Sequence, residues 1–174
     1  MEHRLAQPSD LDEILEVIAD ARAFLRANGI NQWQNGQPGR ETFTGDINNG
    51  NCHVFMDGSK IVGVISVFLE NDPFYEVVYD GKWLTSDTPY AVFHRVAVRG
   101  EYRGNGISAQ MLSFTENYAR KNGFKSIRGD THRDNRAMRR LLEKCGYIHC
   151  GTIHMNEPAP GDIERVCYEK IVED

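Results

Sequence analysis

The sequence predicts an α/β (α+β) fold with a mixed β-sheet of about six to seven strands, flanked by about four helices. Apolar patterns with helical and strand periods alternate along the chain, with an antiparallel hairpin early and a strand–helix–strand unit later. The 174 residues suffice for one buried core, and no linker-like segment divides residues 1–174. We therefore expect a single domain.

The N-terminal half predicts a strand, two helices and a hairpin. In the first helix, apolar residues recur at helical spacing from Leu11 to Leu25. Ser9 or Asp10 can cap its start, and Gly29 can end it. The expected elements are a strand at 3–7, a helix at 10–27, a loop at 31–40, a helix at 41–48, and a hairpin at 51–70 with its turn at Asp57–Gly58.

The C-terminal half begins with an aromatic-rich segment, residues 71–89, whose pattern predicts no regular element. The strand–helix–strand unit after it predicts two parallel strands joined by a right-handed crossover. Asp134 can cap the last helix, and Gly146 can end it. The expected elements are strands at 90–98, 125–132, 147–155 and 164–172, and helices at 106–122 and 135–146.

Composition and charge argue against several classes of protein. The net charge of -5 disfavours sequence-independent nucleic-acid binding, which needs a basic surface. The four cysteines form no CxxC pair and the histidines have no zinc-ligand spacing, so we expect no metal site, no disulfide scaffold and a reducing cytoplasm. The longest apolar run, residues 61–69, is too short for a membrane-spanning helix, and the N-terminus has no apolar signal core.

The stretch from Val96 to Leu112 joins an expected strand to an expected helix through a loop with glycines. A nucleoside-triphosphate loop is excluded because no Gly-Lys-Ser/Thr follows. Gly104, Gly106 and Ala109 match the G-x-G-x-x-A pattern of dinucleotide-binding proteins, but "RGEYR" separates the strand from the first glycine. Glycines here allow a tight turn whose N–H groups face a phosphate at a helix start, although a plain helix-entry loop is the alternative.

The loop Arg103 to Ser108 resembles the phosphate loop of the GNAT acetyltransferases. The resemblance continues along the chain in the same order. "RLAQPSDLDEILEVI" is similar to the family's first strand and helix, "KIVGVISV" to its hairpin strand, "HRVAVRGEYRGNGIS" to its fourth strand and phosphate loop, and "DTHRDNRAMRRLLEKCGYIHCG" to its asparagine-bearing helix. It implies a fold with splayed fourth and fifth strands, and an N-acetyltransferase in which an amine attacks acetyl-CoA directly within a ternary complex.

By this resemblance the cofactor is acetyl-CoA (coenzyme A). The backbone from Val96 to Val98 would pair with the pantetheine arm, and one N–H there would polarise the thioester carbonyl. Asn135 would contact the cofactor, with an ordinary helix-start residue as the alternative. The implied cofactor-binding residues are Val96, Ala97, Val98, Arg103, Gly104, Asn105, Gly106, Ile107, Ser108, Ala109 and Asn135.

The resemblance also suggests catalytic residues. Asp130 matches the place of a catalytic glutamate in some family members, and His132 lies two residues on, so both are candidates for a base acting through water. The alternatives are a turn-capping aspartate and a structural histidine. Leu142 stands where the family usually has the tyrosine that protonates the departing thiolate, so the general acid stays open.

The acceptor is expected to be a small-molecule or peptide amine held by the loops that contain residues 28–39 and 71–90. Aromatic rings and the carboxylates of Asp72 and Asp80 would suit a cation, although anchoring the loops to the core is the alternative use of the rings. His94 and Arg95 should face opposite sides of a strand, and Arg95 can form a structural ion pair. The implied substrate-binding residues are Trp33, Tyr79, Trp83 and His94.

Two other functions stay open. Leu142 is compatible with a non-catalytic acyl-CoA-binding or sensor domain, and the glycine pattern with a dinucleotide-dependent oxidoreductase. No nucleic-acid or membrane partner is expected, and a homodimer stays an option.

Overall fold

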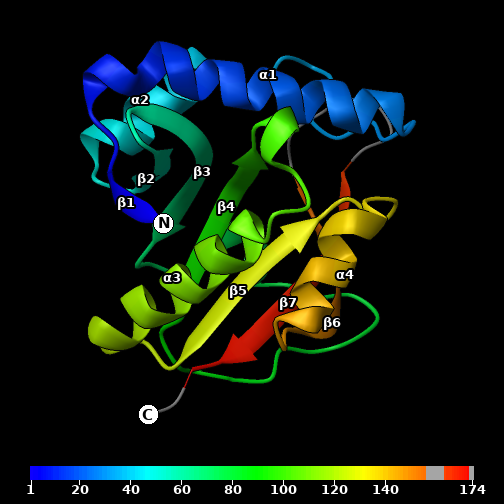
Figure 1. Ribbon diagram of the computed structural model, residues 1–174. Helices are drawn as coiled ribbons and strands as arrows, with labels where there is room; N and C mark the ends of the chain where they lie inside the picture. The colour runs from blue at the N-terminus through cyan, green and yellow to red at the C-terminus, as the bar shows by residue number, and fades with distance from the viewer. Residues whose placement is uncertain (156–162, 173–174) are drawn as a thin grey trace. The chain divides into compact units, whose positions relative to one another are not determined.

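The computed structural model describes residues 1–155 and 163–172, whose strands form a seven-stranded sheet in the order β1-β2-β3-β4-β5-β7-β6. Figure 1 shows the elements in chain order. β4 pairs with β5 in parallel, whereas the pairs β1–β2, β2–β3, β5–β7 and β6–β7 are antiparallel. The predicted mixed sheet and its parallel crossover are confirmed.

The elements agree closely with those expected from periodicity. The strands are β1 (Glu2–Leu5), β2 (Cys52–Asp57), β3 (Lys60–Phe68), β4 (Ala91–Val98), β5 (Ser126–Thr131), β6 (Ile148–His154) and β7 (Glu164–Ile171). The helices are α1 (Leu11–Ala27), α2 (Arg40–Asn48), α3 (Ile107–Lys121) and α4 (Arg136–Lys144), with short 3-10 turns η1 (Pro8–Asp10), η2 (Pro73–Tyr75) and η3 (Gly100–Tyr102). Of the described part of the chain, no helix combines the length and apolar character needed to cross a membrane.

Contacts divide the chain into two compact units. The first comprises residues 1–67 and 94–111, and the second comprises residues 68–93 and 112–174. β4 and α3 each contribute residues to both units. The expectation of one domain over residues 1–174 stays a prediction.

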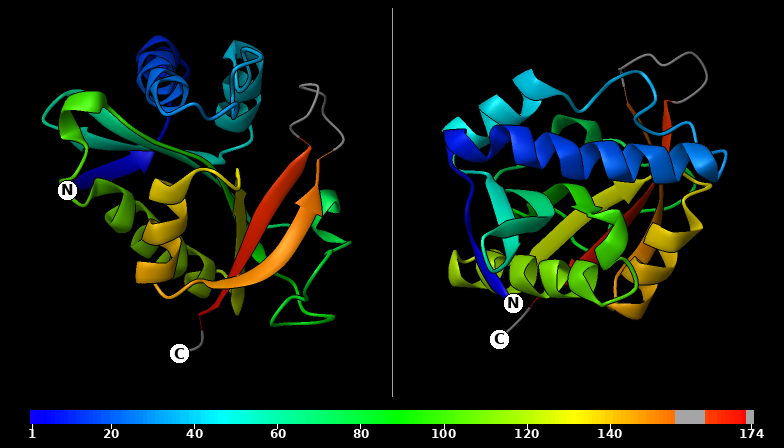
Figure 2. Two further views of the ribbon diagram at one scale, coloured as in Figure 1. Left: turned by 90° about the vertical axis from the view of Figure 1, so that its right-hand side faces the viewer. Right: turned by 45° about the horizontal axis from the view of Figure 1, so that its top comes forward.

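In the first unit, α1 and α2 lie side by side over one face of β1 to β3 (Figure 2). Ile14, Val17 and Ile18 recur at helical spacing along α1 and are fully buried. They share one apolar cluster with Phe43 of α2 and Val64 of β3. The amphipathic pattern that predicts α1 therefore also builds this core.

In the second unit, α4 and the segment at residues 69–90 lie on opposite sides of the paired strands β7 and β6 (Figure 2). That segment, which we call the aromatic segment, contains η2 and is otherwise irregular. Tyr75 and Tyr90 from it form a buried cluster with Cys150, Ile153 and Cys167. Tyr79 also bridges to Thr152 of β6, and this antiparallel bridge attaches the segment to the strand at the sheet's edge.

Of the two predicted helix caps, Asp10 stands at the N-cap position of α1 without a side-chain cap, and Asp134 is wrong. Asp10 makes no side-chain hydrogen bond to α1, because its carboxylate accepts from the Gln7 N–H at 2.7 Å and from Arg4 at 2.6 Å. In α4 the cap is Asn135, not Asp134, and its Oδ1 accepts from the Met138 N–H at 3.2 Å. Local competition for a short polar side chain decides both cases.

Candidate active site

The loop between β4 and α3 has the backbone that a phosphate site needs. Gly104 and Gly106 have φ angles of 84° and 76°, a region that other residues rarely adopt. Among the described residues, nothing but the chain neighbours lies within 4 Å of the Cβ that either glycine would carry. α3 begins at Ile107, so its N-terminal N–H groups and positive dipole end meet this loop. The loop therefore fits a pyrophosphate.

Arg103 contacts α1. Its Nη2 donates to the Asp20 carbonyl at 2.6 Å, and its guanidinium lies 4.7 Å from the centre of the Phe24 ring. The Asp20 carboxylate accepts from the Gly100 N–H at 2.9 Å, so one residue of α1 holds both ends of η3. The sequence indicates a charge for the pyrophosphate, whereas the structure gives this guanidinium a role in fixing the loop. A contact from Arg103 to phosphate stays a prediction.

The other predicted cofactor residues of this loop differ in burial. Ile107 is 2% exposed and packs toward Gly63 of β3, so its side chain anchors α3 and only its backbone can serve a ligand. Ser108 and Ala109 are half-buried, and Asn105 is exposed. Of the β4 residues, Val96 is half-buried while Ala97 and Val98 are buried. Their backbone groups remain the candidates for pantetheine.

β4 is distorted at Arg95, whose φ of 59° is left-handed. Such a conformation costs a residue other than glycine about 1–3 kcal/mol and persists only where its surroundings hold it. Arg95 Nη1 contacts Asp46 Oδ2 at 2.8 Å, and the Ser66 hydroxyl donates to the same oxygen at 2.6 Å. The expected structural ion pair is confirmed. The opposite orientation of His94 and Arg95 assumes a regular strand and stays a prediction.

Asp130 of β5 lies in a polar contact with the aromatic segment. The Tyr75 hydroxyl donates to Asp130 Oδ1 at 2.6 Å, and Arg165 Nε lies 3.9 Å from Oδ2. Burial, and then the charge of Asp130, raise the pKa of Tyr75 well above its usual range. The phenol therefore keeps its proton and donates it to the carboxylate in a hydrogen bond.

His132 lies directly after β5. Its Nδ1 accepts from the Asp134 N–H at 3.1 Å and lies 3.8 Å from Asp134 Oδ2. A ring that accepts at Nδ1 carries its proton at Nε2 when neutral, so it offers a donor there instead of a base. Of the two predicted catalytic residues, this geometry favours Asp130 as the proton acceptor.

Asn135, a predicted cofactor contact, precedes α4, and Leu142, which replaces the tyrosine expected from the resemblance, lies within it. The Asn135 side chain caps the helix, which is the alternative weighed for it, and Leu142 is fully buried. A phenol does reach α4, because the hydroxyl of Tyr168 on β7 accepts from Arg139 Nε at 3.1 Å and contacts Glu143 Oε1 at 3.3 Å. Sequence reasoning missed Tyr168, which occupies an ordinary strand position.

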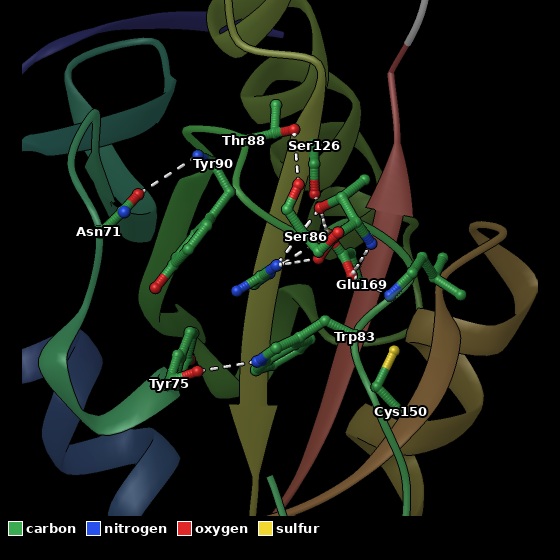
Figure 3. Close-up of polar contacts among 12 residues, drawn as sticks. Asn71, Tyr75, Trp83, Ser86, Thr88, Tyr90, Ser126, Cys150 and Glu169 are labelled. Atoms are coloured by element: carbon green, nitrogen blue, oxygen red, sulfur yellow. Dashed lines mark hydrogen bonds and ion pairs between the residues drawn. The ribbon is translucent and has the colours of Figure 1, made fainter. Parts of the chain in front are cut away.

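The Trp83 side chain makes its polar and stacking contacts with other residues of the protein. Its Nε1 donates to the Tyr75 carbonyl at 2.8 Å (Figure 3). The guanidinium of Arg128 lies 4.2 Å from the centre of the Trp83 ring and 3.7 Å from that of Tyr90, so the two rings stack on one buried cation. These contacts favour the anchoring alternative for Trp83, whose role toward an acceptor stays a prediction.

The remaining predicted acceptor residues occupy different environments. Tyr79 is 44% exposed and stacks on His154 with ring centres 4.2 Å apart. Trp33 packs against the core of the first unit, and its carbonyl accepts from Arg22 Nε at 3.0 Å. His94 is half-buried in β4. Of the four predicted acceptor residues, Tyr79 is the exposed one, whereas Trp33, Trp83 and His94 are half-buried.

A buried polar cluster at Glu169 holds the aromatic segment to the sheet, and sequence reasoning missed it. Glu169 is fully buried and accepts from the Ser126 hydroxyl, from the Leu84 N–H and Thr85 hydroxyl at 2.5 Å each, and from Arg128 Nε at 3.2 Å (Figure 3). Burial raises the pKa of Glu169, but these donors outweigh it and leave the pKa below its usual range. Charged residues inside apolar strands were the available signal.

A mixed sheet with a glycine loop that fits a pyrophosphate at the start of α3 is typical of α/β proteins that bind phosphorylated ligands. Within that class, residues 18–147 match the model of the Acetyltransferase (GNAT) family. The chain belongs to this family of acetyltransferases. The dinucleotide interpretation of Gly104, Gly106 and Ala109 is thereby set aside.

Known proteins with similar sequences or folds agree. The uncharacterized N-acetyltransferase YesJ of Bacillus subtilis (strain 168) is 23% identical over 145 residues, which is 82% of this chain and 78% of that protein. A GNAT-family acetyltransferase from Streptococcus agalactiae 2603 has a TM-score of 0.87 at 32% identity, covering 99% of this chain and 96% of the other. One from Listeria monocytogenes 4b F2365 has a TM-score of 0.73 at 18% identity, covering 98% and 94%, and shows the fold alone.

Proposed function

We propose that the protein transfers an acetyl group from acetyl-CoA to an amine, by direct attack of the amine in a ternary complex. The observation that carries this is the glycine loop, in which two left-handed glycines precede the start of a 15-residue helix and face open space. Acetyl-CoA supplies the activated acetyl thioester when bound. The backbone from Gly104 to Ala109 would hold its pyrophosphate, and that from Val96 to Val98 its pantetheine arm.

Asp130 is proposed to accept the proton of the amine, through water or directly. A free alkylamine with a pKa of about 10.4 is mostly protonated near neutral pH and must lose a proton before it attacks. The Tyr75 hydroxyl donates to the Asp130 carboxyl group, which leaves the remaining lone pairs of its oxygen atoms as candidate acceptors for a proton of the amine. The leaving group is the thiolate of a thiol whose pKa is about 8.5, so it can leave near neutral pH without being protonated. The absence of a general acid at Leu142 is therefore compatible with activity.

The acceptor is proposed to be a cationic small molecule or peptide amine. The aromatic segment presents exposed Tyr79 and Leu84. Its acidic residues outnumber its one basic residue, Lys82, and they are Glu70, Asp72, Glu76, Asp80 and Asp87. Such a surface attracts a positively charged amine. A cytoplasmic location and a homodimer stay predictions.

The glycine loop gives the first test. Gly104→Ala and Gly106→Ala force a side chain into the left-handed region, which costs about 1–2 kcal/mol, so we expect the Kd for acetyl-CoA to rise about tenfold. Gly123→Ala is the matched control, because Gly123 has a φ of 81° and open space at the other end of α3. Titration calorimetry measures the affinity.

Two results would overturn the proposal. Wild-type protein that binds no acetyl-CoA at millimolar concentration excludes the cofactor, and equal affinities in all three variants exclude the loop as its site. A thiol-release assay across amine classes then separates the enzyme from the sensor alternative that Leu142 suggests. Binding without thiol release for any amine would favour the sensor.

A further inference from the structure

Tyr75 is the buried partner of Asp130, although it comes from a segment without regular secondary structure. The residue is 1% exposed, and its hydroxyl donates to Asp130 Oδ1 at 2.6 Å. A buried phenol must find an acceptor, and here that acceptor is the proposed base itself. The contact joins residues 55 positions apart in the sequence, so it is made by tertiary structure and not by a local turn.

The backbone of Tyr75 is fixed on both sides. Its N–H donates to the Asp72 carbonyl at 3.0 Å, and its carbonyl accepts from Trp83 Nε1 at 2.8 Å (Figure 3). Its ring also packs against the rings of Trp83 and Tyr90, with centres 5.3 Å and 6.3 Å away. The hydroxyl is therefore presented from a rigid support.

The rings of Trp83 and Tyr90, which pack against Tyr75, contact the strand that carries Asp130. Arg128, the cation between the Trp83 and Tyr90 rings, lies two residues before Asp130 on β5, so the two side chains share one face of the sheet. Glu169 neutralises Arg128 and also binds the backbone of the aromatic segment. The segment that carries Tyr75 and the strand that carries Asp130 are thus held in register by one buried cluster.

We propose that Tyr75 is a positioning residue that, by binding Oδ1, fixes the orientation of the Asp130 carboxylate relative to the reacting amine. This inference rests on the proposed function, because it assigns Tyr75 a role only through Asp130. The phenol proton stays on Tyr75 throughout, since the raised pKa of the buried phenol opposes its transfer. Loss of the hydroxyl would remove the 2.6 Å hydrogen bond that orients the carboxylate, and misplaced catalytic groups lose about tenfold to a hundredfold in rate.

Tyr75→Phe tests the proposal, because it keeps the ring packing and removes one hydroxyl. We expect kcat for acetyl transfer to fall about tenfold or more, with the KM for acetyl-CoA unchanged. Tyr90→Phe is the matched control, since it removes a hydroxyl of the same segment that donates to the Asp72 carbonyl at 3.2 Å instead. It should keep wild-type kcat.

A double-mutant cycle separates positioning from a general structural effect. In the Asp130→Asn background, Tyr75→Phe should cause no further loss of kcat, because the group it positions is already gone. Circular dichroism and urea denaturation check that each variant folds. If Tyr75→Phe does not fold, Trp83→Phe removes the N–H that holds the Tyr75 carbonyl and should lower kcat in the same direction.

The outcomes distinguish this inference from the proposed function. Wild-type protein without thiol release for any amine overturns the proposed function and the inference with it. An active wild type in which Tyr75→Phe matches Tyr90→Phe, or in which the Tyr75 and Asp130 effects multiply independently, overturns the inference alone. Full activity in Asp130→Asn removes the base that Tyr75 is proposed to position.

Discussion

Gly129 lies between Arg128 and Asp130 on β5, so it faces the opposite side of the sheet from both. An added Cβ would lie 2.2 Å from the ring of Phe93, which is itself 2% exposed and packs edge-on against Tyr147. Neither ring can move without disturbing the core. The absence of a side chain at residue 129 therefore makes the room that the Phe93 ring occupies.

Gly129→Ala should destabilise the protein by about 1–3 kcal/mol, because a methyl group must be forced into a packed core. Gly45→Ala, on the exposed side of α2 with nothing within 4 Å of its Cβ among the described residues, should instead stabilise it by about 0.5–1 kcal/mol. Urea denaturation measures both. Equal effects of the two substitutions would contradict the assigned role of Gly129.

For single residues, the sequence predicted unusual backbone angles better than it predicted the partners of side chains. Gly104 and Gly106 were predictable because a phosphate loop is local and glycine alone supplies its φ angles. The contact from Tyr75 to Asp130 was not, because it joins distant residues and the segment around Tyr75 has no periodicity. Arg103 shows the same limit, since a loop arginine can serve a ligand or a neighbouring helix.

Among the elements, β4 is a largely buried strand with a left-handed residue, Arg95, near its middle. Arg95 is held there by Asp46 of α2, and the two side chains are 23% and 9% exposed. This ion pair comes directly before the backbone of Val96 to Val98, the stretch proposed to meet pantetheine. α2 therefore stabilises the conformation from which that stretch continues.

Asp46→Ala should destabilise the protein by about 2–3 kcal/mol, because it leaves Arg95 and the Ser66 hydroxyl without this carboxylate in a largely buried site. Asp12→Ala breaks a comparable pair with Arg40 whose side chains are 83% and 61% exposed, and should cost about 0–1 kcal/mol. Thermal or urea denaturation gives both values. A loss for Asp46→Ala no larger than that for Asp12→Ala would refute the assignment.

The order and type of the elements were predictable because each carries its own period, as the apolar spacing of α1 shows. The caps were less so, since Asp10 holds the N-cap position of α1 but its carboxylate binds Gln7 and Arg4 instead, and Asn135 replaces Asp134 as the cap of α4. The distortion of β4 at Arg95 has no sequence signal, because arginine is not a residue that favours left-handed backbone. Such positions are selected by the contacts around them.

For the whole molecule, stability should depend on two buried groups, one in each unit. Burial, with a smaller effect of His3, lowers the pKa of His53 from 6.5 to about 4. His53 therefore becomes protonated below about pH 6.5 in the unfolded chain, but only below about pH 4 in the folded protein. The pKa of Glu169 is also lowered, so its stabilisation is present above pH 4.5 and is lost as the pH falls through its folded value.

The free energy of unfolding should therefore fall from pH 6.5 toward pH 4, with His53 contributing about 3 kcal/mol over that interval. His53→Gln should flatten this part of the curve, because a neutral side chain takes up no proton. His154→Gln, at an exposed position of β6, is the control and should leave the slope unchanged. Denaturation curves across pH provide the test, and a slope unaffected by His53→Gln would contradict it.

The bridge between Tyr79 and Thr152 bears on how copies of this chain can associate. β6 ends the sheet, and an unprotected edge strand invites pairing with a strand from another molecule. Here Thr152 already exchanges backbone hydrogen bonds with Tyr79 at 2.8 Å and 2.9 Å. A dimer or aggregate that extends the sheet through β6 would first have to detach the aromatic segment. The segment proposed to select the acceptor thus also hinders the pairing of a second chain with this edge of the sheet.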